Sequence, residues 1–136
     1  MDQEPDKYSE DQKKEHTKFD GSAEITIGNL FTYQRRMMCT TLSGIPMPII
    51  TITACKSTGK KMAKREAVII TSRVHPGETN SSFVFSGMFE MVTRASDPVA
   101  QYLRENFVIK MVPCLNPDGV VRGNYRSSLA GVDLNR

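Results

Sequence analysis

An uninterrupted apolar run at residues 67–72 (AVIITS) constrains the fold more than any other stretch of this sequence. Continuous β-branched runs without polar alternation are typical of strands buried on both faces of a parallel sheet. A second run, residues 107–115 (FVIKMVPCL), has the same character. Between the two, residues 79–94 have helical spacing of apolar side chains, and Asp97-Pro98 opens a further helical segment. Strand, helix and strand in this order predict a right-handed crossover and an α/β fold.

A hairpin is predicted before the first of these strands. Residues 32–54 read as two strands joined by a turn at residues 43–46, with Ile50 and Ile52 alternating with threonines. The adjacent Met37 and Met38 are expected to fill the core. Residues 56–66 (KSTGKKMAKRE) are expected to form a basic, flexible connector. In the helix at 79–94, the spacing predicts one apolar row with a second beside it: Phe83, Gly87, Glu90 and Met91, then Phe85 and Phe89.

Composition divides the chain into a tail and one domain. Residues 1–20, which include His16, are almost all polar or charged and predict a disordered tail, so residues 21–136 form the folded domain. The net charge of +3 is too small to indicate a nucleic-acid partner, and no apolar run is long enough to cross a membrane. The tail lacks the apolar segment of a secretory signal. Three cysteines without a paired spacing indicate reduced thiols and a cytoplasmic location.

Polar residues follow both predicted strands at the point where each ends. His75 and Glu78 come after the first, and Asn116–Gly119 (NPDG) comes after the second. Sites in open α/β sheets form beyond the carboxyl ends of the strands, and histidine with carboxylate suits zinc. The alternative is a polar strand exit in which Pro76-Gly77 only makes the turn. For NPDG we expect a type I turn and nothing more.

The last segment carries three arginines, Arg122, Arg126 and Arg136, with few balancing carboxylates. Guanidinium groups bind carboxylates bidentately, so this segment predicts either a site for anionic groups or an ordinary solvated basic loop.

Three motifs, HPGETN, LNPDGVVRGNYRSSLAG and VDLNR, resemble in their order and spacing those of the zinc metallocarboxypeptidase family. The likeness is closer to its cytosolic carboxypeptidase branch, the tubulin deglutamylases, and covers about Tyr33 to Arg136. It implies a Zn²⁺ ion with His75 and Glu78 as two of its three ligands. The roles implied for the other residues are an orienting carboxylate for His75 at Asp133, an oxyanion-stabilising group at Arg126, and a site for the terminal carboxylate at Asn135 and Arg136.

The family's third zinc ligand, a histidine, and its catalytic glutamate lie downstream of the position of Arg136. We therefore expect this chain to be the N-terminal part of a catalytic domain, a partial mixed or parallel sheet with crossover helices, inactive as given. The activity implied for the complete enzyme is removal of C-terminal or side-chain-linked glutamates from protein tails such as those of tubulin, in the cytoplasm. Two alternatives stay open: a non-catalytic module that binds carboxylates, and an incomplete gene-model fragment.

Overall fold

The computed structural model describes residues 23–27, 30–55 and 57–136, so the predicted tail at 1–20 lies outside the described residues. The described elements, in chain order, are β1 (Ala23–Ile27), β2 (Phe31–Thr40), β3 (Pro46–Ala54), α2 (Gly59–Met62), β4 (Glu66–Thr71), α3 (Asn80–Thr93), α4 (Pro98–Asn106), β5 (Phe107–Val112) and α5 (Pro117–Arg122).

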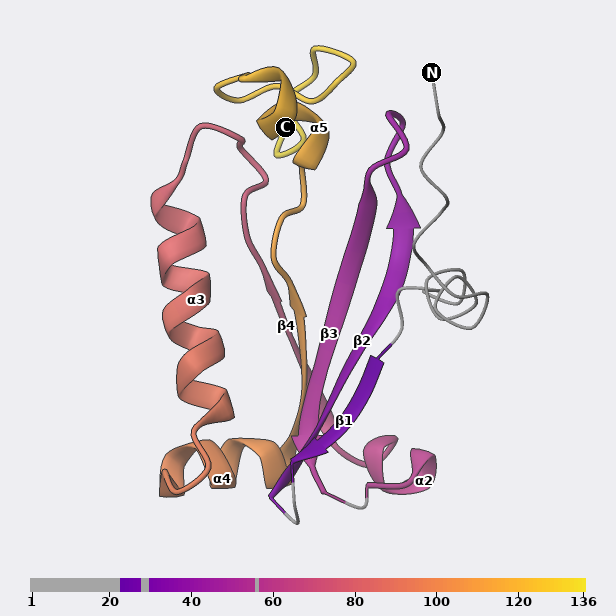
Figure 1. Cartoon of the computed structure of the whole chain (residues 1–136), viewed down its shortest axis with the longest axis vertical. Helices are drawn as coiled ribbons and strands as arrows, with labels where there is room; N and C mark the ends of the chain where they lie inside the picture. Colours follow the sequence, from indigo (N-terminus) through magenta and orange to yellow (C-terminus); the bar gives the residue numbers. More distant parts are fainter. Residues whose placement is uncertain (1–22, 28–29, 56) are drawn as a thin grey trace, which may run out of the picture.

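The strands form one mixed sheet in the order β1-β2-β3-β5-β4 (Figure 1). The pairs β1–β2, β2–β3 and β3–β5 are antiparallel, whereas β4 and β5 are parallel. The connection from β4 to β5 runs through α3 and α4, which confirms the predicted crossover and the α/β class. The parallel arrangement brings the carboxyl ends of β4 and β5 to one edge of the sheet, where α5 also lies (Figure 1).

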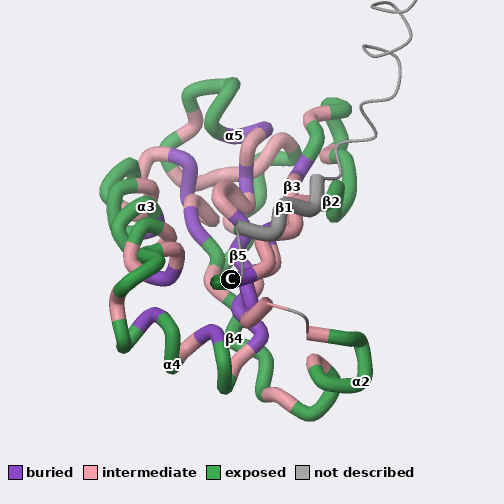
Figure 2. The backbone as a smooth tube through the Cα atoms, turned by 60° about the horizontal axis from the view of Figure 1, so that its bottom comes forward, coloured by how far each residue is buried: buried purple, intermediate pink, exposed green. Residues whose placement is uncertain are grey.

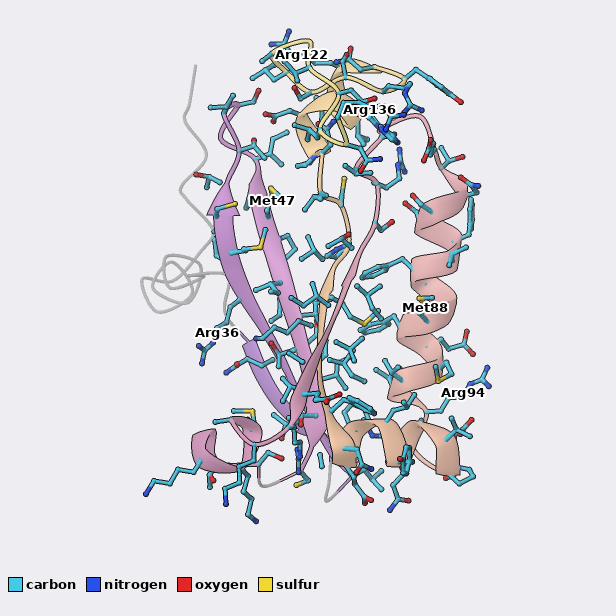
Figure 3. All side chains as sticks on the ribbon, turned by 180° about the vertical axis from the view of Figure 1, so that it is seen from behind. Arg36, Met47, Met88, Arg94, Arg122 and Arg136 are labelled. Atoms are coloured by element: carbon cyan, nitrogen blue, oxygen red, sulfur yellow. The ribbon has the colours of Figure 1, made fainter. Side chains whose placement is uncertain are left out.

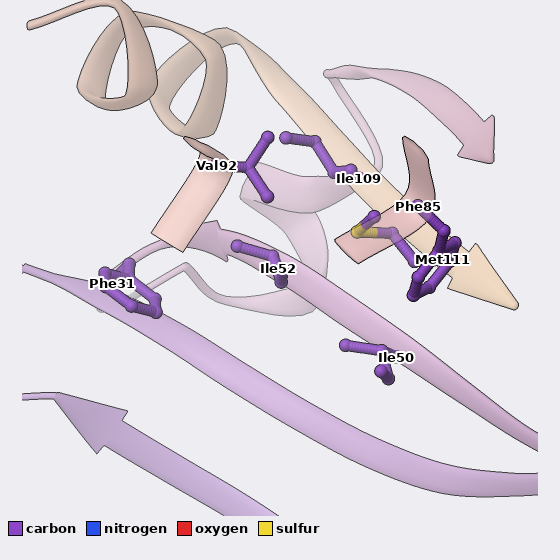
Figure 4. Close-up of a cluster of buried hydrophobic side chains, with 7 residues drawn as sticks. All are labelled: Phe31, Ile50, Ile52, Phe85, Val92, Ile109 and Met111. Atoms are coloured by element: carbon purple, nitrogen blue, oxygen red, sulfur yellow. The ribbon is translucent and has the colours of Figure 1, made fainter. Parts of the chain in front are cut away.

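The core lies between the sheet and α3. Its buried members come from three strands and one helix and pack as a single cluster (Figure 4): Phe31, Ile50, Ile52, Phe85, Val92, Ile109 and Met111. The alternation of isoleucine and threonine in β3 predicted the side chains that face the core, because Ile50 and Ile52 are both buried, but Thr53 on the other face is buried as well. The tube coloured by burial shows the same division, with buried segments in the central strands and exposed ones on the outer sides of the helices (Figure 2).

The end of the sheet opposite α5 is closed by α4. The predicted Asp97-Pro98 opening is confirmed, since the Asp97 carboxylate accepts hydrogen bonds from the backbone N–H groups of Val99 and Ala100. Arg104 on this helix is buried, with its guanidinium carbon 4.8 Å from the centre of the Phe31 ring. Its Nη1 donates to the carbonyls of Val92 and Arg94 at the end of α3, and burial lowers the pKa of this guanidinium. Arg104 thus joins both helices to the sheet.

The structure contradicts three expectations about local burial and structure, and it shows which of the two rows of α3 is buried. Residues 67–72 form a strand, but β4 is the last strand of the described sheet and is largely exposed rather than buried on both faces. Met37 and Met38 are exposed, because they lie where β2 extends beyond the cluster. In α3 the second row faces the core, since Phe85 is buried and Phe83 is exposed. The basic connector contains the short helix α2, capped by the Thr58 side chain.

None of the described helices combines the length and the hydropathy that a membrane span requires.

Candidate metal centre

The turn after β4 is held in a strained and closely packed form. Arg73 adopts a left-handed backbone conformation with φ of 55°, which is uncommon for a residue with a side chain. Its Nε donates to the carbonyl of Pro76 at 3.0 Å, and its Nη1 donates to the Ser82 hydroxyl at 3.1 Å. The guanidinium therefore folds back over the turn that carries His75 and Glu78, and joins it to the start of α3.

Gly77 brings this turn against the segment that carries Arg126. The backbone N–H of Gly77 donates to the carbonyl of Tyr125 at 2.8 Å. A Cβ at this position would lie 2.3 Å from Cδ2 of the Tyr125 ring, closer than non-bonded carbon atoms approach. The absence of a side chain at Gly77 allows the Tyr125 ring to lie directly against the turn.

His75 is buried and contacts a carboxylate at each ring nitrogen. Its Nδ1 lies 3.3 Å from Oε1 of Glu78, and its Nε2 lies 2.9 Å from Oδ1 of Asp133. The shorter contact is a hydrogen bond when the proton is on Nε2. In that tautomer Nδ1 presents a lone pair to the Glu78 carboxylate, an arrangement that a cation bound between the two would stabilise.

The positions of these two donor atoms fit zinc. In a tetrahedral site with bonds of about 2.0–2.1 Å, neighbouring ligand atoms are about 3.3–3.4 Å apart. The separation of 3.3 Å between Nδ1 of His75 and Oε1 of Glu78 matches this spacing. Within the described part of the chain, no group of three His, Cys, Asp or Glu side chains is arranged to hold a metal ion, so His75 and Glu78 supply two donors.

Arg126 lies on the same cluster. Its Nη2 is 3.2 Å from Oδ2 of Asp133 and 3.2 Å from Nε2 of His75, and its Nη1 is 3.5 Å from Oε1 of Glu78. Four of the residues singled out from the sequence, separated by up to 58 positions, are therefore in mutual contact. With a neutral imidazole, the two carboxylates outweigh the one guanidinium, so the group has a net negative formal charge, which suits a bound cation.

Asp133 is held as a carboxylate. The backbone N–H of Asn135 donates to Oδ1 at 2.9 Å, and His75 and Arg126 contribute further hydrogen bonds. These contacts lower the pKa of Asp133 to about 2, so the group is ionised at neutral pH. A charged acceptor at Nε2 favours the tautomer in which Nδ1 is free to bind a metal.

Asn135 and Arg136 lie beside this cluster but not in it. Both are exposed, and the Arg136 side chain lies at the α5 end of the molecule, as does that of Arg122 (Figure 3). The Nη1 of Arg136 donates to the Asn135 carbonyl at 3.1 Å. The structure thus brings these two residues to the same edge of the sheet as His75, with their side chains outside the contacts that join the other four.

The NPDG segment is more than the type I turn expected from the sequence. Asn116 is the N-cap of α5, because its Oδ1 accepts a hydrogen bond from the backbone N–H of Gly119 at 3.0 Å. Asp118 is buried and accepts a hydrogen bond of 2.6 Å from the hydroxyl of Thr41 in the β2–β3 hairpin. The Asn-Pro pair is a signal for a helix start that could have been weighed against the turn.

A cavity of about 360 Å³ lies on the other side of the loop that carries Asp133. Val132 and Leu134 line it, whereas Asp133 between them contacts His75. An antiparallel bridge between Ser127 and Asp133 keeps the loop extended here, so neighbouring side chains point in opposite directions. The cavity is therefore separate from the charged cluster.

Comparison with known sequences identifies, over most of the chain, the same family that the three motifs resemble. A family model described as zinc carboxypeptidase matches residues 32–136. Cytosolic carboxypeptidase 4 from Homo sapiens is 48% identical over 109 residues, which are 76% of this chain and 10% of that protein. Cytosolic carboxypeptidase 2 from Danio rerio is 51% identical over 102 residues, which are 74% of this chain and 14% of that protein. The chain thus spans a small part of the length of these relatives.

Solved structures with the same fold include two bacterial enzymes. A metallo-carboxypeptidase from Burkholderia cenocepacia aligns with a TM-score of 0.65 at 28% identity, over 94% of this chain and 32% of its own. A metallo-carboxypeptidase from Pseudomonas aeruginosa, in complex with (2-guanidinoethylmercapto)succinic acid, aligns with a TM-score of 0.63 at 26% identity, over 74% of this chain and 26% of its own.

Proposed function

This chain belongs to the zinc carboxypeptidase family, and from that premise we propose that it carries part of the active site of a cytosolic metallocarboxypeptidase. The observation that supports this most directly is the His75 ring, whose Nδ1 lies at the spacing of two neighbouring zinc ligands from Glu78 Oε1 and whose Nε2 contacts Asp133. His75 and Glu78 are the proposed ligands, and Asp133 orients the imidazole. When bound, zinc supplies a Lewis acid for hydrolysis of a peptide bond.

Arg126 is the proposed oxyanion-stabilising residue. Its guanidinium already lies against both His75 and Glu78, so a carbonyl oxygen at this site would meet a fixed positive charge. Because charge on that oxygen develops only in the transition state, the contribution of Arg126 falls mainly on kcat.

Asn135 and Arg136 are the proposed ligands of the substrate's terminal carboxylate. Their side chains are exposed, and the backbone N–H of Asn135 donates to the Asp133 carboxylate, so a carboxylate bound there lies next to the charged cluster. The Pseudomonas aeruginosa relative in complex with a succinic acid derivative supports a carboxylate site in this fold. The relatives' names favour the cytoplasm, and for the whole protein we propose glutamate-rich protein tails, such as those of tubulin, as substrates.

The first test is zinc binding by the 136-residue chain. Two donors make an incomplete site, so we expect weak zinc binding and no hydrolysis of a glutamate-tailed peptide. Glu78→Gln should weaken the binding further, whereas Glu90→Gln on the exposed face of α3 should leave it unchanged. Calorimetric titration measures both. Tight stoichiometric binding, measurable hydrolysis, or equal affinity for the two variants would contradict the proposal.

The second candidate function is a non-catalytic module that binds carboxylates. Two observations favour this module. Asn135 and Arg136 are exposed, and the site beside them has only two metal donors among the described residues. A peptide ending in glutamate should bind, and its C-terminal amide should bind less well. NMR titration measures peptide binding by the wild-type chain and by Arg136→Ala, each with and without zinc. The carboxylate-binding module binds the peptide equally in both conditions, whereas the metallopeptidase site binds it better with zinc.

A further inference from the structure

Asn116 is a buried amide at the junction between β5 and α5. Only 3% of this residue is exposed. Its backbone N–H donates to the carbonyl of Arg73 at 3.1 Å, and its Oδ1 caps α5 at Gly119. Its Nδ2 makes two further hydrogen bonds, to the carbonyl of Val74 at 3.2 Å and to the carbonyl of Ser127 at 3.4 Å.

Both of these carbonyls belong to neighbours of the proposed site residues. Val74 directly precedes His75, and Ser127 directly follows Arg126. Ser127 is also the residue that forms the antiparallel bridge with Asp133. One side-chain amide therefore joins the backbone beside the imidazole to the backbone beside its carboxylate partner.

We propose that Asn116 is a positioning residue that keeps His75, Asp133 and Arg126 in register. It touches neither metal nor substrate, and it acts through the main chain on either side of the 2.9 Å contact between His75 Nε2 and Asp133 Oδ1. As far as it concerns zinc, the inference rests on the function proposed above. It gives NPDG a role in the site that goes beyond the turn.

Asparagine suits this position for a chemical reason. The site needs one acceptor, for the helix cap, and two donors, for the carbonyls, and a carboxamide supplies all three. An aspartate keeps the acceptor but presents oxygen to two carbonyls, and an alanine leaves all three groups without their partner. The close approach of the same segments at Gly119 leaves little room for water, since a Cβ there would lie 2.7 Å from the Ser127 carbonyl oxygen and 2.3 Å from Cγ of Pro76.

A helix cap alone does not account for these contacts. The cap uses Oδ1 only, and the two bonds from Nδ2 lead away from α5 to segments 42 and 11 residues distant along the chain. Asn116→Asp separates the two roles, because it retains the cap and removes both donors. Thr41→Val is the matched control: it breaks the 2.6 Å hydrogen bond to Asp118 on the same helix without touching the residues beside His75.

The experiment measures the site in folded protein, at one neutral pH and well below each variant's melting temperature. Long-range proton–nitrogen NMR of the His75 ring reports the tautomer and the Asp133 hydrogen bond without metal. Competition with a chelator reports zinc affinity. We expect Asn116→Asp to disturb the ring signals and to weaken zinc binding by about tenfold, within the range measured for groups that orient metal ligands. Thr41→Val should change neither.

The outcomes distinguish this inference from the proposed function. If the ring signals and zinc affinity of Asn116→Asp match those of the wild type, Asn116 is only a cap and the inference is wrong. Equal disturbance by Thr41→Val would also overturn it, since a general loosening of α5 would then suffice. If zinc binding by the wild type does not depend on Glu78, the proposed function fails, and the ring signals of the metal-free variants still decide whether Asn116 positions His75.

Discussion

The two parallel strands, β4 and β5, are similar in sequence and opposite in burial. Both are six-residue apolar runs, EAVIIT and FVIKMV, paired in register along their whole length. In β5 four of the six residues are buried, whereas in β4 none is. The contrast is sharpest for two isoleucines: Ile109 is 3% exposed and Ile69 is 66% exposed.

Position in the sheet explains the difference. Strand β5 lies between β3 and β4, and one of its faces meets the core cluster. Strand β4 pairs only with β5 among the described strands, so its other edge carries unpaired backbone groups. Its Val68 and Ile70 line a cavity of about 220 Å³ with apolar residues of α3, while Ile69 points to the other face. An apolar run therefore identifies a strand but does not by itself establish what covers it.

The contrast ends where the strands end. The turns after β4 and β5 are joined to each other by hydrogen bonds between Asn116 and residues 73 and 74. The exposed strand thus leads into a turn as closely packed as the one that follows the buried strand, and it is the turns that form the candidate site.

The largest difference in stability is expected between isoleucine-to-alanine substitutions in the two strands. Ile109→Ala removes buried methyl groups from the core and should lower the free energy of unfolding by about 2–5 kcal/mol. Ile69→Ala removes mostly exposed surface and should cost no more than about 1 kcal/mol. Urea unfolding followed by circular dichroism measures both. Equal losses of unfolding free energy would mean that β4 is covered in solution, and the difference in burial between the two strands would not hold.

A medium effect is expected from glycine substitutions in the segments that follow the two strands, at Gly77 in the turn after β4 and at Gly119 in the first turn of α5. At Gly119 a methyl group meets Pro76 and the Ser127 carbonyl, so Gly119→Ala should destabilise by about 1–3 kcal/mol. At Gly77 the closest atoms belong to the Tyr125 ring, which is mostly exposed and can rotate, so Gly77→Ala should cost less.

Gly87→Ala in the middle of α3 is the control for both turn variants. No atom lies within 4 Å of a Cβ at this position, so the substitution should stabilise the protein by about 0.5–1 kcal/mol. The midpoints of urea unfolding give the order of stability of the three glycine variants directly. A Gly77→Ala variant less stable than Gly119→Ala would show that the turn after the exposed strand is the more rigid of the two.

The smallest effect on stability is expected from a charge on the exposed strand. Ile69→Lys should change the free energy of unfolding by no more than about 0.5 kcal/mol. It should, however, reduce self-association, because a lysine on an open edge strand disfavours pairing with another chain. Sedimentation velocity over a range of concentrations tests this, with Val99→Lys on the exposed face of α4 as the control for added charge. If both variants reduce association equally, the strand edge is not the contact.

The sequence predicted strands β2 to β5, the crossover and the edge at which the polar residues meet, because these follow from local patterns and from the handedness of crossovers, but it did not predict β1. It failed on the burial of residues 67–72, which depends on neighbouring strands that local patterns do not specify. It failed similarly for Met37 and Met38, because the apolar character of a residue does not determine where the hairpin extends beyond the core.

Within the candidate site, the meeting of His75, Glu78, Arg126 and Asp133 was expected from the resemblance, and the structure brings all four into contact. The contacts of Asn116 could not be read from NPDG. A turn and a helix cap share that pattern, and the partners of Nδ2 lie far away along the chain. Local sequence specifies which groups an amide offers, and only the fold determines which groups it meets.

The contact between His75 and Asp133 also has a consequence for the order of events during synthesis. The two residues are separated by 58 positions. At about 5–20 residues per second, a ribosome needs about 3–12 s to add that stretch. Throughout this interval the imidazole exists without the carboxylate that orients it. Under the proposed function, zinc capture by His75 and Glu78 is therefore expected only after Asp133 has been added and the site has folded, rather than as a guide to its folding.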